Sequence, residues 1–182
     1  MKRLNHNSCC APGASCCGPG AGSCEPPKTT REITIDFLYL DLETCDRCRS
    51  TDSSLDEALD AVSQVLSAAG YAVKVNKVKI DTSEMAVHYQ FLSSPTIRIN
   101  GADIMPEVLE SNCGDCGDIC GDSVDCRVWE YDGALYNQPP RALIVDAILK
   151  EVYGGGHKDA QTDYKLPENL KKFFDSLKNK KV

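Results

Sequence analysis

The pattern of apolar residues predicts a strand followed by a long helix near the start of the chain. Seven of the ten residues from 33 to 42 are Ile, Leu, Phe or Tyr, which is typical of a strand buried on both faces of a sheet. Beyond this strand, apolar residues recur at helical spacing until Gly70 ends the pattern. The helical positions are Leu55, Leu59, Val62, Val65, Leu66 and Ala69.

The middle of the chain continues with a strand, a short helix and a hairpin. Apolar residues alternate over residues 73–80, but their phase switches, which predicts a strand with a bulge near Asn76. After a short helical segment, residues 96–99 and 102–104 flank the dipeptide Asn100-Gly101, a strong signal for a two-residue hairpin turn.

The second half of the chain has weaker patterns. Residues 105–126 show no periodicity and predict a loop, whereas residues 127–136 predict a small hairpin around Asp132-Gly133. Pro139-Pro140 is expected to open a further helix. The last segment predicts an amphipathic helix that is either a strut packed on the domain, which we favour, or a partner-binding element. Its apolar face carries Leu170, Phe173, Phe174 and Leu177.

A pair of cysteines, Cys45 and Cys48, follows the first strand in a C-x-x-C arrangement. Two cysteines at this spacing on one helical turn can close a disulfide, attack one or chelate an ion. If the helix starts at Cys45, its unpaired backbone amides favour a thiolate there and make Cys45 the nucleophile. If the segment Ser54 to Glu57 is instead a capping box, the helix starts near Asp52 and leaves the pair in a loop.

Four more cysteines lie in the glycine-rich loop: Cys113, Cys116, Cys120 and Cys126. Two close pairs on glycine-rich turns can wrap one ion, which predicts a tetrahedral zinc site. Two disulfides, or a thiol reservoir that exchanges with the C-x-x-C pair, are the alternatives that the spacing leaves open.

The N-terminal residues 8–21 are two copies of one seven-residue unit, each with adjacent cysteines. Such Pro/Gly/Ala-rich sequence cannot bury a core, so we expect residues 1–31 to be a disordered tail. Paired thiolates on a mobile tether suit soft ions such as Cu(I), Zn, Hg(II) or As(III). The tail cysteines are therefore candidate metal ligands: Cys9, Cys10, Cys16, Cys17 and Cys24.

The cysteine content, the apolar runs and the charge of the chain restrict its location and the classes of partner. The chain has 11 cysteines in 182 residues but no apolar leader and no apolar run that would span a bilayer, so we expect a cytoplasmic protein whose thiols serve redox chemistry or metal ligation. Residues 32–153 carry 22 acidic and 9 basic side chains. This excess of negative charge repels phosphate backbones and makes nucleic acid an unsuitable partner.

Residues 32–153 resemble the thioredoxin superfamily, through Ile35-Asp36-Phe37, the Cys45 to Cys48 turn and Ser94-Pro95-Thr96. The chain is most similar to an uncharacterised prokaryotic thioredoxin-like family that combines this turn, a Ser-Ser-Pro-Thr-Ile-Arg-Ile-Asn-Gly run and a cysteine loop before Val-Trp-Glu-Tyr. The resemblance implies an α/β fold with a central mixed sheet flanked by helices over residues 32–153, in which residues 105–126 form a Cys-rich insertion. We expect residues 1–31 to be a flexible tail and residues 154–182 to be a linker followed by the C-terminal amphipathic helix. The resemblance also implies that Ser94 and a cis Pro95 face the dithiol.

Two functions follow from these observations. The first is a thiol-disulfide oxidoreductase without a required cofactor, in which Cys45 attacks a disulfide and Cys48 resolves the mixed disulfide. Its partner would be a disulfide-bearing protein or a small thiol substrate. The alternative is a non-enzymatic protein that binds or transfers Hg, As, Cu or Zn, captured by the tail cysteines. The sequence leaves the oligomeric state open.

Overall fold

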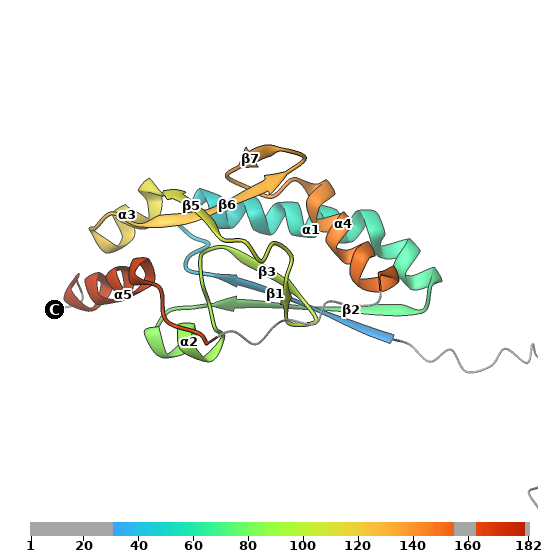
Figure 1. The fold of residues 1–182 in the computed structure, drawn as a ribbon, viewed down its shortest axis with the longest axis horizontal. Helices are drawn as coiled ribbons and strands as arrows, with labels where there is room; N and C mark the ends of the chain where they lie inside the picture. The colour runs from blue at the N-terminus through green and yellow to red at the C-terminus, as the bar shows by residue number, and fades with distance from the viewer. Residues whose placement is uncertain (1–30, 155–162, 181–182) are drawn as a thin grey trace, which may run out of the picture.

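The computed structural model describes residues 31–154 and 163–180, which form two β-sheets with helices packed around them (Figure 1). The chain is a mixed α/β protein, as the sequence predicts. The five cysteines of the N-terminal tail lie outside the described residues, so their predicted metal ligation stays a prediction.

The larger sheet has four strands in the order β2, β1, β3, β4. These strands span Tyr71–Lys79, Arg31–Tyr39, Thr96–Ile99 and Ala102–Asp103, respectively. β1 pairs in parallel with β2 and antiparallel with β3, and β3 pairs antiparallel with β4. The buried first strand becomes the middle of the sheet, which explains its nearly continuous apolar composition.

The predicted bulge near Asn76 is wrong. β1 and β2 pair residue by residue along their whole length, with Asp36 opposite Asn76. The phase of the apolar residues switches because the sheet is covered on both faces. Val73 and Val75 pack on one buried cluster, whereas Val78 packs on the other.

Helices cover the two faces of this sheet (Figure 1). α1 (Asp46–Ala68) and α4 (Arg141–Tyr153) pack against each other over one face. The cluster beneath them, here called the aliphatic core, contains Ile33, Ile35, Phe37, Leu55, Ala58, Val62, Leu66, Ile97, Ile99, Trp129, Ile144 and Ile148.

The other face is covered by α2 (Ser83–His88) and α5 (Glu168–Lys180). α5 buries Leu170, Phe173 and Phe174 and contacts both α2 and the short helix α3 (Gly114–Cys120). The second cluster, here called the cysteine corner, contains Leu38, Leu40, Cys45, Cys48, Ile80, Ala86, Phe91, Cys113, Cys116, Cys120, Val124, Cys126, Leu170, Phe173 and Phe174.

The segment 105–126, predicted to be a loop, is largely ordered into regular elements. β5 (Leu109–Asn112) leads into α3 (Gly114–Cys120), and β6 (Asp125–Tyr131) pairs antiparallel with β5 and with β7 (Ala134–Tyr136). The prediction was wrong because α3 buries cysteines in place of aliphatic residues. Cysteine behaves as a small apolar residue, and Cys113, Cys116 and Cys120 already have helical spacing in the sequence.

Within the described ranges, no helix is long and apolar enough to cross a membrane.

Candidate metal centre

Four cysteine sulfurs converge in the cysteine corner. The Sγ atoms of Cys45, Cys113, Cys116 and Cys126 all lie within 4.8 Å of one another, and all four side chains are buried. Cys116 Sγ lies 3.2 Å from Cys126 Sγ and 3.8 Å from Cys45 Sγ. No disulfide joins any of the six cysteines in the described part of the chain. The cluster therefore unites one cysteine of the C-x-x-C pair with three from the insertion.

The starts of two helices position three of the four clustered cysteines. α1 begins at Asp46 with Cys45 as its N-cap residue, so the dithiol lies on the first turn. The alternative start near Asp52 is wrong, because Ser54 is a buried residue in the middle of this helix. Cys113 is likewise the N-cap residue of α3, and Cys116 lies on its first turn.

Cys126 reaches the cluster from β6. The turn between α3 and β6 is tight, since an added Cβ at Gly117 would lie 2.9 Å from the carbonyl oxygen of Asp122. Gly121 ends α3 with φ of 82°, a conformation that favours glycine. The Cys113 amide also donates a hydrogen bond of 2.8 Å to the carbonyl oxygen of Val124. These contacts bring the start of β6 back beside the first turn of α3.

Cys120, which the sequence analysis grouped with the loop ligands, is not one of the four. Its Sγ instead lies 3.8 Å and 3.7 Å from the carbonyl oxygens of Gly117 and Asp122. Cys120 is one helical turn beyond Cys116, which moves its backbone about 6 Å along the axis. The structure therefore brings three of the four loop cysteines together with Cys45 and leaves Cys120 outside the cluster.

Cys48 lies beside Ser94, the residue that precedes Pro95. Its Sγ lies 3.4 Å from Ser94 Oγ, and the Ser94-Pro95 peptide bond is cis. Ser94 Oγ also accepts a hydrogen bond of 3.1 Å from the Leu40 amide, which fixes the serine to the end of β1. The side chains of Cys45 and Cys48 interact with each other, although Cys48 is not among the four clustered residues.

Arg47 ties the first turn of α1 to the small sheet. Its guanidinium donates to the carbonyl oxygens of Cys126 at 3.1 Å, Ser111 at 3.2 Å and Asn112 at 2.9 Å, and to Ser111 Oγ at 3.0 Å. A second tie joins α1 to α3, because the Asp46 amide donates to a carboxylate oxygen of Asp115 at 2.7 Å. Arg47 and Asp115 thus hold the segments that carry all four cysteines.

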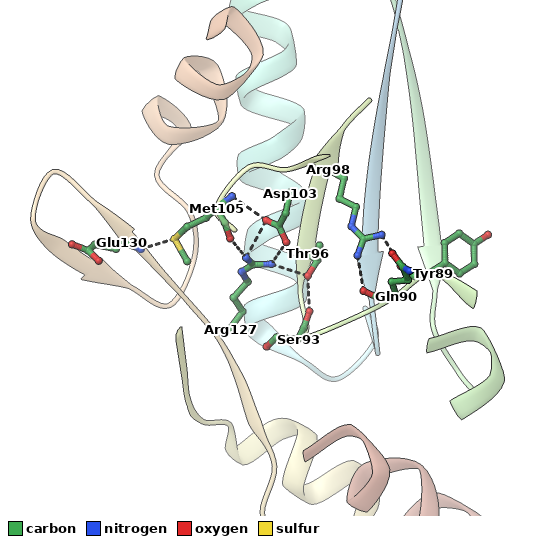
Figure 2. A network of polar contacts seen from close by, with 9 residues as sticks. All are labelled: Tyr89, Gln90, Ser93, Thr96, Arg98, Asp103, Met105, Arg127 and Glu130. Carbon is green, nitrogen blue, oxygen red and sulfur yellow. Dashed lines mark hydrogen bonds and ion pairs between the residues drawn. The ribbon is translucent and has the colours of Figure 1, made fainter. Parts of the chain in front are cut away.

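A buried arginine links β6 to β3 and β4 (Figure 2). The guanidinium of Arg127 pairs with Asp103 at 2.8 Å and donates to Thr96 Oγ1 at 2.9 Å. Its backbone amide donates to the Ser94 carbonyl oxygen at 2.7 Å. The residue after Cys126 is therefore fixed to the strand opposite Cys48.

The C-terminal helix closes the site from another side. Asn169 bridges β6 by accepting from the Asp125 amide at 3.0 Å and donating to the Asp125 carbonyl oxygen at 2.7 Å. Lys180 Nζ donates to the carbonyl oxygens of Asp118 and Ile119 in α3, both at 3.0 Å. α5 is therefore a packed strut that holds α3 and β6 together.

The thiols in the cluster divide into two groups by pKa. Hydrogen bonds from neighbouring thiols, above all Cys113, lower the pKa of Cys45, and interaction with Cys116 lowers the pKa of Cys113. Interaction with Cys113 raises the pKa values of Cys116 and Cys126, and burial adds to this. Interaction with Cys45, followed by burial, raises the pKa of Cys48. Negative charge is therefore shared among a few of these sulfurs while the others retain their protons.

A polar cavity of about 290 Å³ adjoins the cluster. It lies between the first turn of α1, the turn from β5 to α3, and Asn137-Gln138, and its wall includes Cys113, Asp46 and Asp115. Cys113 is 4% exposed, whereas Cys45 and Cys48 are fully buried. Cys113 is therefore the member of the cluster that faces this cavity.

Fold and site together define a mixed α/β protein with a buried cluster of four cysteines, a group that can bind a metal ion or undergo redox chemistry. Residues 33–148, more than half of the chain, match the family described as "Domain of unknown function (DUF2703)", and the chain belongs to this family. A protein of Archaeoglobus fulgidus, which bears the name "Uncharacterized protein", is 31% identical over 112 residues. These cover 57% of this chain and 76% of that relative. No solved structure matches the chain.

Proposed function

We propose that this protein binds one thiophilic metal ion, such as Zn²⁺, through the thiolates of Cys45, Cys113, Cys116 and Cys126. The observation that carries the proposal is the convergence of four buried sulfurs within 4.8 Å from three separate segments. Thiolates prefer Zn²⁺, Cu(I) and other soft ions, whereas Mg²⁺ and Ca²⁺ prefer oxygen ligands.

The distances fit a tetrahedral ion. Zn–S bonds of about 2.3 Å place neighbouring sulfurs of a tetrahedron about 3.8 Å apart. The pair of Cys116 and Cys45 already has a sulfur separation of 3.8 Å, and that of Cys116 and Cys126 is 3.2 Å. Small side-chain rotations are sufficient to make all the edges equal around an ion.

Charge supports the same conclusion. Four buried thiols cannot all ionise together without a cation, because each thiolate repels the next in a medium of low polarity. A divalent ion removes this conflict by replacing the protons that Cys116 and Cys126 retain. The hydrogen bonds from Arg47 to the carbonyl oxygens around the cluster then orient the ligands, as outer partners do in other metal sites.

We further propose that the scaffold is thioredoxin-like. The order of strand, helix, strand, helix and hairpin supports this, as does the mixed sheet with β1 between β2 and β3. The C-x-x-C pair starts α1, and Ser94 lies against Cys48. In this interpretation, the insertion supplies three thiolates that convert the first cysteine of a C-x-x-C pair into a metal ligand.

Burial separates the two functions inferred from the sequence. Exchange with a disulfide-bearing protein requires access to the attacking sulfur, and both Cys45 and Cys48 are fully buried. Metal ligation is favoured by the same burial, which excludes competing water. A cytoplasmic location, where thiols stay reduced, fits this function, and delivery of the ion by the tail cysteines is part of the proposal.

Metal stoichiometry and spectroscopy test the proposal in the full chain, with the five tail cysteines replaced by serine so that they do not bind metal. We expect one ion per chain by native mass spectrometry and, after loading with Co²⁺, the absorption of a tetrahedral thiolate complex. Cys126→Ser should lower the affinity for the ion by about 100-fold or more. Cys120→Ser is the matched control, because this buried thiol lies near the cluster but outside it, and its affinity should stay within threefold. Failure to bind an ion, or an equal loss in both variants, would contradict the proposal.

A further inference from the structure

Metal ligation does not use Cys48, although this thiol is fully buried beside a ligand. Its Sγ lies 3.4 Å from Ser94 Oγ. It also shares the first turn of α1 with Cys45, which is the N-cap residue of that helix. Cys48 is therefore placed to react with Cys45.

We propose that Cys48 makes the metal centre sensitive to hydroperoxides: peroxide drives formation of a Cys45–Cys48 disulfide, which removes one ligand and releases the ion. This inference rests on the proposed metal-binding function. Peroxide is small enough to enter the cavity beside the first turn of α1, whereas a protein disulfide is not. Cys113 lines this cavity, and the Cys45 sulfur lies within 4.8 Å of the Cys113 sulfur behind it.

The backbone permits this bond. The Arg49 amide donates to the Cys45 carbonyl oxygen at 3.1 Å, so Cys45 and Cys48 lie on one turn of helix. Side chains three residues apart on a helix have Cβ atoms about 5–6 Å apart, slightly more than a disulfide requires, and rotation at the N-cap residue can close the difference.

The chemistry balances with one peroxide. The Cys45 thiolate attacks one peroxide oxygen, the O–O bond breaks, and Cys45 becomes a sulfenic acid while hydroxide leaves. Cys48 sulfur then displaces the sulfenic oxygen, the S–S bond forms, and the Cys48 proton leaves with the hydroxide as water. The two sulfurs lose two electrons in total, and the peroxide is reduced to one water and one hydroxide, which takes a proton from the solvent.

Cys48 is the resolving thiol because it does not bind the ion. In the loaded site, Cys113, Cys116 and Cys126 each donate an electron pair to the ion, whereas the lone pairs of Cys48 are not engaged in ligation. The short separation of Cys116 and Cys126, 3.2 Å between sulfurs, offers a competing disulfide only when the ion is absent. A map of the disulfide formed from the loaded protein distinguishes these routes.

The test uses the full chain with serine at the five tail positions, loaded with one Zn²⁺ and treated with hydrogen peroxide. Released zinc is followed with a chromogenic chelator, and the disulfide is located by peptide mapping. We expect release to accompany the loss of two hydrogens in the peptide that contains Cys45 and Cys48. Cys48→Ser should bind zinc with unchanged stoichiometry but release it at least tenfold more slowly, whereas Cys120→Ser should release it at the rate of the parent.

Equal release from Cys48→Ser and its parent, or a disulfide among the other three ligands, would overturn this inference and leave the metal site intact. A parent protein that never retains zinc would overturn the proposed function itself. If Cys48→Ser does not fold, the peptide map of the parent protein still tests the inference, because it detects the Cys45–Cys48 disulfide directly.

Discussion

The aliphatic core and the cysteine corner lie on opposite faces of one sheet, yet they are built from different chemistry. The aliphatic core consists of Ile, Leu, Val, Phe, Ala and Trp side chains, and burial of their apolar area is sufficient to stabilise it. The cysteine corner contains six cysteines among its fifteen buried residues. Their thiols interact so strongly that their pKa values are driven apart. We infer that one face folds by hydrophobic burial alone and that the other needs a ligand to be fully stable.

Removal of the ion is expected to have the largest effect, and to affect only one of the two regions. Structural zinc contributes about 10–16 kcal/mol in small zinc domains, so we expect chelation to cost several kcal/mol here. Hydrogen exchange should increase in α3, β6 and α5 and stay unchanged in the centre of α1 and in β1. A uniform increase in hydrogen exchange over both regions would show that the ion does not stabilise the cysteine corner selectively.

Single truncations in the two regions should differ in their dependence on metal. Leu55→Ala in the aliphatic core should cost about 2–5 kcal/mol of unfolding free energy, equally with and without the ion. Phe174→Ala in the cysteine corner should cost a similar amount and also weaken metal binding, because α5 holds α3. Denaturant titrations of loaded and metal-free protein, with affinity measured by chelator competition, check both. A loss of affinity in Leu55→Ala as large as in Phe174→Ala would show that the regions are coupled.

The pH dependence of metal affinity follows from the pKa shifts. The pKa values of Cys116 and Cys126 are raised, so these thiols hold protons at neutral pH, whereas those of Cys45 and Cys113 are lowered. Binding should therefore release at least two protons, and affinity should fall by at least about 100-fold for each unit by which the pH drops below 7. Calorimetry in buffers of different ionisation enthalpy counts the protons. Affinity that does not change between pH 6 and 7 would mean that all four ligands are already ionised.

The smallest effect on metal affinity is expected from substitution of Arg47, whose hydrogen bonds hold the segments that carry the ligands. Arg47→Ala removes four hydrogen bonds to β5 and β6, and we expect about tenfold weaker metal binding. Arg49→Ala is the matched control, because Arg49 is half exposed and pairs with Asp46 at the surface. Its affinity should stay within twofold in the same chelator competition. Equal losses of affinity in the two variants would contradict the role of the Arg47 hydrogen bonds in metal binding.

Much of the aliphatic core could be predicted from the sequence because its signals are local. The apolar run of β1, the helical spacing before Gly70 and the Asn100-Gly101 turn each report a structure formed by neighbouring residues. The helix of the insertion was missed for a physical reason, since its buried face consists of cysteines, which an aliphatic pattern does not include. The bulge expected near Asn76 failed because a two-sided strand shows both phases of alternation.

The sequence by itself determined that this chain has a C-x-x-C pair after a buried strand and a second set of cysteines in an insertion. Only the tertiary structure decided that Cys45 joins Cys113, Cys116 and Cys126, and that Cys120 and Cys48 remain outside. Ligands from segments about seventy residues apart meet because the pairing of β5 with β6 and the hydrogen bonds of Arg47 bring those segments together. Spacing along a chain describes only local neighbours, and a metal centre depends on where sulfurs point in space.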